Sequence, residues 1–304
     1  MNLLSVDDLS ASDMHSIFNL ADEIKKGAFF SVRQGTSIAL LFQKPSTRTR
    51  VSFESAMARL NGHSIYIDVN TSQLSRGESW GDTAMVLSSY VGMIAARLFK
   101  QDDLIELAAH SSIPVINALT DMEHPCQALS DIYTVRELHR GGIKGARIAF
   151  VGDIAANTAN SLMVAATKLG AEMTLVGPKG YQPNHDYVRL ARKYGKVELT
   201  CDVKSGVVDA DFIYTDTFVS MGQEAQAKKR RKLFAAYQVN SRLLGSARKN
   251  ARVMHCLPAH RGEEITSEVL DGSRSVVWQQ ARNKMLLEQA IILYLYRMER
   301  NGVL

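Results

Sequence analysis

The chain has 304 residues, 46% of them apolar and 22% charged, which suits two ordinary globular domains of about 150 residues each. No apolar run reaches the roughly 18 residues of a membrane-spanning helix, which excludes a membrane span. The net charge of +5 leaves two kinds of partner open, a nucleic acid or a small anionic substrate.

Short strands rich in Val, Ile and Leu alternate with helical segments along the chain. In the first half, strands are predicted at residues 37–43, 64–68, 93–99 and 114–118. In the second half, they are predicted at 147–152, 173–177, 212–215, 253–257 and 275–278. Such continuously apolar strands are covered on both faces, and strand–helix alternation builds parallel sheets from βαβ units. We therefore predict an α/β protein that divides near residues 140–144, with helices at 125–138 and 284–298.

Hydroxyl and basic side chains follow the first predicted strand, in the run KPSTRTR at residues 44–50. The first turn of a helix favours an anion, and Arg48 can hold two phosphate oxygens at once. The same run also fits a plain helix cap with an Arg50–Glu54 pair on the surface. It lacks the glycines and the Lys-Ser/Thr ending of a P-loop. Phosphate binding and simple capping therefore both stay open.

Two further motifs offer donors and acceptors near predicted helix starts. The run HPCQ at 124–127 sets His124 and Gln127 on one helix face, where they fit a carbonyl and an amide, or a simple cap. The run DTFVSMG at 216–222 brings the Asp216 carboxylate and a hydroxyl past a strand end. These groups suit an amino-acid head group, although a helix-start turn uses the same residues.

Two other motifs lie at the ends of predicted strands. HCLP at 255–258 places Cys256 where open α/β sheets bind ligands, as a nucleophile, a polarising neighbour or a small buried residue. The Cys and His content is too sparse for a zinc site, so no metal is predicted. GDIAANTANS at 152–161 lacks the G-x-G-x-x-G spacing, which argues against a dinucleotide.

Together, STRTR and HPCQ resemble the carbamoyl-phosphate signature of the aspartate and ornithine carbamoyltransferases, while HCLP and D…SMG resemble the ornithine branch. The resemblance covers essentially the whole chain, with the motifs in order. It implies an α/β fold of two doubly wound parallel-sheet domains, joined by two linking helices, with the active site in the interdomain cleft. Residues 1–138, completed by a C-terminal helix at 284–304, would bind carbamoyl phosphate, and residues 139–283 would bind ornithine.

The activity implied by the resemblance is transfer of the carbamoyl group of carbamoyl phosphate to the δ-amine of L-ornithine. The products would be L-citrulline and phosphate, as in arginine biosynthesis, without cofactor or metal ion. Transfer to a related amine such as putrescine or an acylated ornithine is an alternative, and aspartate fits less well. A non-enzymatic protein that binds phosphate-bearing ligands is the alternative of a different class. The assembly implied is a homotrimer or a multiple of trimers.

The resemblance also implies the roles of individual residues. Those that would bind carbamoyl phosphate are Ser46, Thr47, Arg48, Thr49, Gln73, Arg97, His124, Gln127, Leu257 and Lys284, with Gln73 reaching the site of a neighbouring subunit. Those that would bind ornithine are Asn157, Asp216, Ser220 and Met221. In catalysis, Arg97 and His124 would stabilise the oxygen of a tetrahedral intermediate, and Cys256 would orient and help deprotonate the amine.

The chain departs from the family pattern in four places. The second residue of an Asn-Arg pair is Lys284, which cannot make the fork-like contact of an arginine. Arg282 stands before that pair, where the family pattern has an acidic residue. Trp80 stands where the pattern has a small or aliphatic residue. The turn after Asp153 carries one extra residue, so Asn157 is placed by a choice of alignment. These departures bear on which amine is accepted.

Two remaining features concern partners and location. The run KKRRK at residues 228–232 has no aromatic residues nearby, which is typical of a solvated helix face rather than a nucleic-acid site. The segment before Ser10 carries Asp7 and Asp8 and no basic residue, which argues against a leader peptide. Three cysteines leave one without a partner, which fits a reducing compartment. We therefore expect a cytoplasmic protein with no nucleic-acid or membrane partner.

Overall fold

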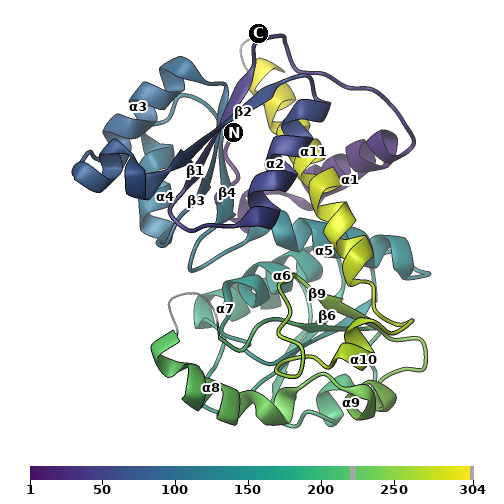
Figure 1. Cartoon of the computed structure of the whole chain (residues 1–304). Helices are drawn as coiled ribbons and strands as arrows, with labels where there is room; N and C mark the ends of the chain where they lie inside the picture. Colours follow the sequence, from purple (N-terminus) through teal and green to yellow (C-terminus); the bar gives the residue numbers. More distant parts are fainter. Residues whose placement is uncertain (220–223, 302–304) are drawn as a thin grey trace. The chain divides into compact units, whose positions relative to one another are not determined.

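The computed structural model describes residues 1–219 and 224–301, and these form two compact units. The first unit comprises Met1–Leu129 and Lys284–Leu304, and the second comprises Ser130–Asn283. Helices α5 (Pro125–Leu138) and α11 (Val277–Asn301) each contribute residues to both units (Figure 1). The chain therefore passes from one unit to the other inside helices α5 and α11.

The first unit is built on a four-stranded parallel sheet in the order β2-β1-β3-β4. Its strands are β1 (Ser37–Phe42), β2 (His63–Asp68), β3 (Met93–Arg97) and β4 (Val115–Leu119). Helices α3 (Trp80–Tyr90) and α4 (Gln101–Ala109) cover one face, while α2 (Thr47–Arg59), α11 and α1 (Ala11–Lys25) lie on the other side (Figure 1). Every residue of β1 and β3 is buried, as expected for apolar strands covered on both faces.

The second unit is built on a five-stranded parallel sheet in the order β7-β6-β5-β8-β9. Its strands are β5 (Arg147–Val151), β6 (Glu172–Val176), β7 (Val197–Thr200), β8 (Phe212–Thr215) and β9 (Arg252–His255). Helices α6 (Asn157–Lys168) and α7 (His185–Tyr194) lie on one side, and α8 (Ala227–Phe234), α9 (Ser241–Ser246) and α10 (Ser267–Leu270) on the other (Figure 1). Two such parallel sheets confirm the predicted α/β, two-domain fold class.

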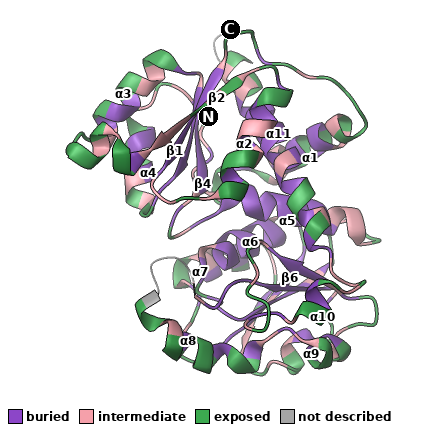
Figure 2. Ribbon diagram, in the orientation of Figure 1, coloured by how far each residue is buried: buried purple, intermediate pink, exposed green. Residues whose placement is uncertain are grey.

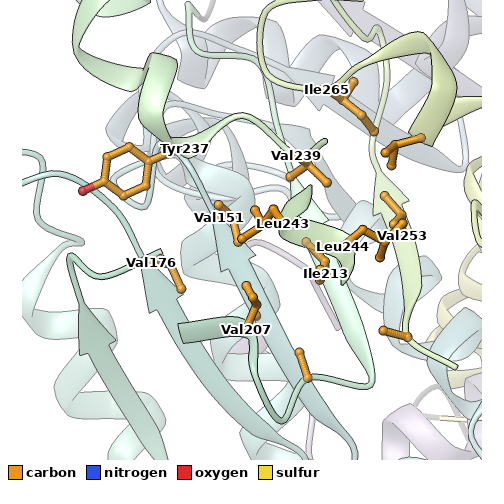
Figure 3. Close-up of a cluster of buried hydrophobic side chains, with 14 of the residues drawn as sticks. Val151, Val176, Val207, Ile213, Tyr237, Val239, Leu243, Leu244, Val253 and Ile265 are labelled. Carbon is orange, nitrogen blue, oxygen red and sulfur yellow. The ribbon is translucent and has the colours of Figure 1, made fainter. Parts of the chain in front are cut away.

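One core layer of the second unit lies between its sheet and the helices that follow β8. Figure 3 shows Val151, Ile213 and Val253 of three adjacent strands facing Leu243 and Leu244 of α9. Short 3₁₀ turns connect the main elements of both units. They are η1 (Val6–Asp8), η2 (Val69–Thr71), η3 (Gln73–Arg76), η4 (Ser205–Val207), η5 (Glu224–Gln226) and η6 (Ala235–Tyr237).

Burial follows the expected layering within each unit. Figure 2 shows buried residues on the sheets and exposed residues along the outer sides of the helices. Among residues 1–219 and 224–301, no helix is both long enough and apolar enough to cross a bilayer.

The predicted strand at 275–278 is wrong. Ser275 forms only an isolated bridge with Val253, and α11 begins two residues later at Val277. A short apolar run fits a buried helix start as well as a strand, so periodicity alone could not separate the two. Strand β7 was not predicted because it is an edge strand in which Glu198 is exposed and only Val197 is fully buried.

Strand order singles out one place in each sheet. The order reverses between β1 and β3 in the first sheet, and between β5 and β8 in the second. In open α/β sheets, ligands bind beyond the carboxyl ends of the strands at such a reversal. The loops after these four strands are therefore the first places to look for bound substrates.

Candidate active site

The loop after β1 leads directly into the first turn of α2. Ser46 has extended backbone angles and caps this helix, because its Oγ accepts a hydrogen bond from the Thr49 backbone N–H at 3.3 Å. Thr47 and Arg48 are exposed in the same turn, whose other N–H groups have no partner within the helix. The helix cap is present, and the turn still offers N–H groups, hydroxyls and one guanidinium to an anion.

Arg50 contacts other side chains of the protein. Its Nε donates to Glu54 at 2.9 Å, and its guanidinium lies 3.8 Å from the centre of the Tyr66 ring. The expected i,i+4 pair is therefore present, while Arg48 remains the arginine of this turn that is directed to solvent. The two arginines of the motif thus have separate environments.

Lys284 brings a buried positive charge to the same turn. It lies on α11, far away in sequence, and its Nζ is 3.4 Å from Thr49 Oγ1. Both side chains are buried. A lysine supplies positive charge to this turn without the planar fork of an arginine.

Three buried polar side chains lie at the end of β3 or in the segment that follows β4. Arg97 ends β3 at a shift in register against β4, His124 directly precedes α5, and Gln127 lies in the first turn of that helix. Burial holds the pKa of His124 well below its usual range, and the positive charges of Lys284 and Arg97 lower it further. His124 is therefore neutral near pH 7 and keeps one N–H donor beside two cations.

The segment that holds Gln73 and Trp80 lies beyond the edge strand β2. Gln73 is exposed at the start of η3, and Trp80 is half-buried as the first residue of α3. Burial raises the pKa of Asp103 on α4, and the side chain of Trp80 opposes that rise. The helix begins at Trp80, because the Ser79 hydroxyl accepts from the Asp82 N–H and caps it.

Asp216 is the centre of the polar cluster in the second unit. It follows β8 and is buried, with Oδ2 accepting from Thr158 Oγ1 at 2.7 Å. Its Oδ1 accepts from the Thr217 N–H at 2.7 Å and from Cys256 Sγ at 3.0 Å. Asn157 is the first residue of α6, next to Thr158. Sequence reasoning missed Thr158, although it belongs to the motif at 152–161.

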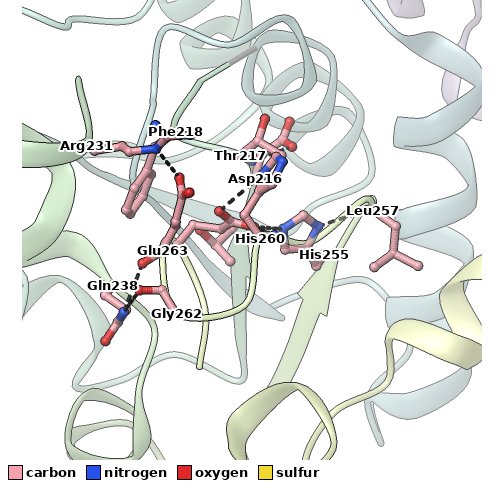
Figure 4. A network of polar contacts seen from close by, with 12 residues as sticks. Asp216, Thr217, Phe218, Arg231, Gln238, His255, Leu257, His260, Gly262 and Glu263 are labelled. Atoms are coloured by element: carbon pink, nitrogen blue, oxygen red, sulfur yellow. Dashed lines mark hydrogen bonds and ion pairs between the residues drawn. The ribbon is translucent and has the colours of Figure 1, made fainter. Parts of the chain in front are cut away.

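His255 ends β9, and Figure 4 shows it on the same side of the sheet as Asp216. Cys256 follows it and contacts Asp216. Each of these three side chains offers one ligand atom, and the three atoms lie within 4.8 Å of one another. However, His255 already uses both ring nitrogens, Nδ1 with the Leu257 N–H at 2.8 Å and Nε2 with Glu264 at 3.1 Å. What remains for a ligand is a carboxylate beside a thiol, which suits a cationic amine better than a metal ion.

The basic run at 228–232 is only partly a solvated face. Lys228, Lys229, Arg231 and Lys232 are exposed as expected, but Arg230 is buried, which corrects that interpretation. The Arg230 guanidinium forms an ion pair with Asp153 and donates to the Phe218 carbonyl at 2.6 Å. Arg230 thus ties the segment after Asp216 to the turn after β5.

Ser220 and Met221, expected to bind ornithine, lie outside the described residues. The remaining expected residues fall into two groups. In the first unit, Thr49, Arg97, His124, Gln127 and Lys284 are buried polar side chains, while Thr47, Arg48 and Gln73 are exposed. In the second unit, Asp216 and Cys256 are in contact, with Asn157 and Leu257 adjacent in sequence to residues of that cluster.

Comparison with known families defines the class of this protein. Residues 1–137 match the carbamoyl-phosphate-binding domain of the aspartate/ornithine carbamoyltransferases, and residues 144–295 match their Asp/Orn-binding domain. The chain belongs to the aspartate/ornithine carbamoyltransferase family.

Its relatives point to one branch of that family. The chain is 46% identical over 300 residues to a protein of Pyrococcus furiosus named "Ornithine carbamoyltransferase, anabolic", covering 96% of this chain and 95% of the relative. It is 43% identical over 296 residues to the ornithine carbamoyltransferase of Bacillus subtilis, covering 96% and 92%. The solved structure of the P. furiosus enzyme superposes with a TM-score of 0.91 over 96% of this chain and 95% of that one. That of an anabolic ornithine carbamoyltransferase from Campylobacter jejuni, 34% identical, gives 0.93 over 98% and 99%.

Proposed function

We propose that this chain transfers the carbamoyl group of carbamoyl phosphate to the δ-amine of L-ornithine, giving L-citrulline and phosphate. The observation that carries the proposal is that each sheet has a cluster of polar side chains beyond the strand ends where its strand order reverses. The first holds a capped helix turn with Arg97 and Lys284, and the second holds the Asp216–Cys256 pair. One cluster suits a phosphorylated carbonyl compound and the other suits an amine. The name of the P. furiosus relative supports the biosynthetic direction.

In the first unit, the phosphate would be held by the first turn of α2. Ser46, Thr47, Arg48 and Thr49 would supply N–H groups, hydroxyls and the guanidinium, and Lys284 would add charge from α11. The leaving group is a phosphate dianion, so these donors stabilise the charge that develops as its bond to carbon breaks. Gln73 of a neighbouring subunit would complete the phosphate-binding site.

The carbamoyl group would lie against Arg97, His124 and Gln127. As the amine attacks, the carbonyl oxygen gains negative charge, and Arg97 with the neutral His124 would donate to it. Gln127 can accept from the carbamoyl NH₂. Loss of one such donor typically costs about 10²–10³ in rate.

In the second unit, Asp216 and Cys256 would bind the δ-ammonium. Asn157, at the start of α6, would also bind ornithine, and the Leu257 carbonyl would face the carbamoyl group. The ammonium must lose a proton before its nitrogen can attack, and a neighbouring acceptor lowers the barrier to that transfer. Nitrogen then bonds to the carbonyl carbon, the carbon–oxygen bond to phosphate breaks, and no covalent enzyme intermediate is needed. The reaction depends on positioning and charge stabilisation.

A colorimetric assay for ureido products tests the proposal. Purified protein is incubated with carbamoyl phosphate and L-ornithine, putrescine, an acylated ornithine or L-aspartate in turn. We expect citrulline from L-ornithine at a rate well above the other amines. If another amine were preferred, the chain would still be a carbamoyltransferase, but with that amine as its substrate. If no amine gave a ureido product, the proposal would be wrong.

We further propose a homotrimer, or a multiple of trimers, located in the cytoplasm. Four apolar side chains of the first unit are exposed, on the edge strand β2 and on helices at either face of its sheet, and neighbouring subunits would cover them. They are Val51 of α2, Ile65 of β2, and Met85 and Val86 of α3. A cytoplasmic location is supported by the three cysteines, none of which belongs to a disulfide.

A further inference from the structure

His255 occupies a position that the proposed chemistry does not use. It ends β9, one residue before Cys256, and its side chain is fully buried. Figure 4 shows its ring between two partners, the backbone of Leu257 on one side and a carboxylate on the other. Its own backbone N–H donates to Gln280 Oε1 at 3.0 Å. The residue is therefore held from three directions.

The two partners define which ring nitrogen carries the proton. The Leu257 backbone N–H is only a donor, and it lies 2.8 Å from Nδ1, so Nδ1 must accept. The proton is then on Nε2, which donates to Glu264 Oε1 at 3.1 Å. The buried Glu264 also accepts from the His260 N–H at 2.5 Å, which fixes the carboxylate in turn.

The accepted N–H belongs to a residue with an unusual backbone. Leu257 has φ of 61°, in the left-handed region that residues with a side chain rarely adopt. Such a conformation persists only where the surroundings hold it, and here the hydrogen bond to His255 does so. The conformation of Leu257 sets the direction of its carbonyl and of the chain next to Cys256.

We propose that His255 is a positioning residue of the transfer reaction, which accepts the Leu257 N–H at Nδ1 and so holds Leu257 in its left-handed conformation. Glu264 serves this role indirectly, by keeping the proton on Nε2. The inference rests on the proposed function, since it assigns His255 to the Cys256–Leu257 end of the amine site. His255 itself touches no substrate and exchanges no proton during the reaction.

Two substitutions separate this role from simple packing. In His255→Asn, the amide oxygen falls near the position of Nδ1 and can still accept from the Leu257 N–H. In His255→Gln, the amide reaches the position of Nε2 and can still donate to Glu264, but Leu257 loses its acceptor. We expect kcat to fall by about tenfold or less in the Asn variant and by about 100-fold in the Gln variant, because small displacements of reacting groups have effects of that size.

A third variant keeps the test decisive if His255→Gln is poorly stable. Glycine adopts positive φ without strain, so Leu257→Gly combined with His255→Gln should recover kcat several-fold over His255→Gln alone. Extra backbone freedom would not repair a general folding defect. Thermal unfolding of all variants and the KM for each substrate are measured in parallel, and we expect the loss in kcat rather than in KM.

The outcomes distinguish the two proposals. A wild-type protein that makes no ureido product ends the proposed function, whatever the variants do. An active wild type with the Gln variant equal to or better than the Asn variant overturns the positioning role alone. Losses in kcat that follow the unfolding temperature across the set, with no recovery by Leu257→Gly, would also overturn it.

Discussion

Glu288 lies one helical turn beyond Lys284 on α11, and both side chains are buried. Burial raises the pKa of Glu288 to about 7, although the charge of Lys284 and the Ser52 hydroxyl oppose the rise. Between its ordinary pKa of 4.5 and about 7, the folded protein keeps a proton that the unfolded chain releases. Stability therefore falls as pH rises through this window and levels off above it.

We expect Glu288→Gln to remove that loss. Relative to wild type, the variant should gain unfolding free energy between pH 5 and pH 8, by at most about 3 kcal/mol at about 1.4 kcal/mol per pKa unit. Lys284 loses a nearby carboxylate in the variant, which reduces the gain. Urea unfolding at both pH values measures it, with the exposed Glu23→Gln on α1 as the control. A gain that is the same at pH 5 and pH 8 would contradict the assignment.

Arg48 and Lys232 are both exposed cations, yet we expect them to respond differently to substitution. Arg48→Lys keeps the charge at the start of α2 and loses the fork that grips two phosphate oxygens. A charge-assisted hydrogen bond contributes about 1.5–3 kcal/mol, so the KM for carbamoyl phosphate should rise about 10- to 100-fold. Lys232→Ala on α8 should leave steady-state kinetics within about twofold. If Lys232→Ala proved the more damaging change, the phosphate site would not be at α2.

At the scale of elements, strands with one dominant physical signal were predictable. β1, β3, β5 and β8 are central, and their short apolar runs are covered on both faces, so composition alone identified them. β7 has a weaker signal because an edge strand leaves residues such as Glu198 in solvent. The start of α11 was predicted as a strand because a run of three apolar residues is too short for a period that separates a strand from a helix.

Helix α8 shows why tertiary contacts escape a sequence pattern. Five basic residues in a row predict a solvated face, and four of them are exposed. Arg230 is the exception, since its guanidinium pairs with Asp153 and lies about 5 Å from the centres of the Tyr181 and Phe234 rings. Nothing in the run itself distinguishes Arg230, because Asp153 and Tyr181 lie far away in sequence, after other strands.

At the scale of the whole molecule, the candidate site was predictable where side chains belong to contiguous motifs. The run at 44–50 and the His124–Gln127 pair were identified by spacing, and Cys256 by its place after a strand. The links between motifs were not predictable, because they join segments far apart in sequence. Thr158 with Asp216, and Thr49 with Lys284, are such links. His255 belongs to the HCLP motif, but its proposed role was not predictable, because it depends on contacts with Glu264 and with the backbone of Leu257.

The proposed trimer makes a prediction about shared sites. Gln73 follows the edge strand β2 and is exposed, so we propose that it acts on a neighbouring chain whose own α2 supplies Arg48. Variants Gln73→Ala and Arg48→Ala should each be nearly inactive. After the two are unfolded, mixed in equal amounts and refolded, about a quarter of the sites should pair a native Arg48 chain with a native Gln73 neighbour in a closed threefold ring. Close to a quarter of wild-type citrulline production should then return.

The matched control uses the double variant Gln73→Ala/Arg48→Ala. Mixed with the Gln73→Ala single variant, it leaves every chain without Gln73, so no site can be completed and activity should stay at the level of the single variant. Sites that lie wholly within one chain would stay inactive in both mixtures, which would contradict sharing. Light scattering on the wild type gives an independent check, since a monomeric mass would rule out a site that needs two chains.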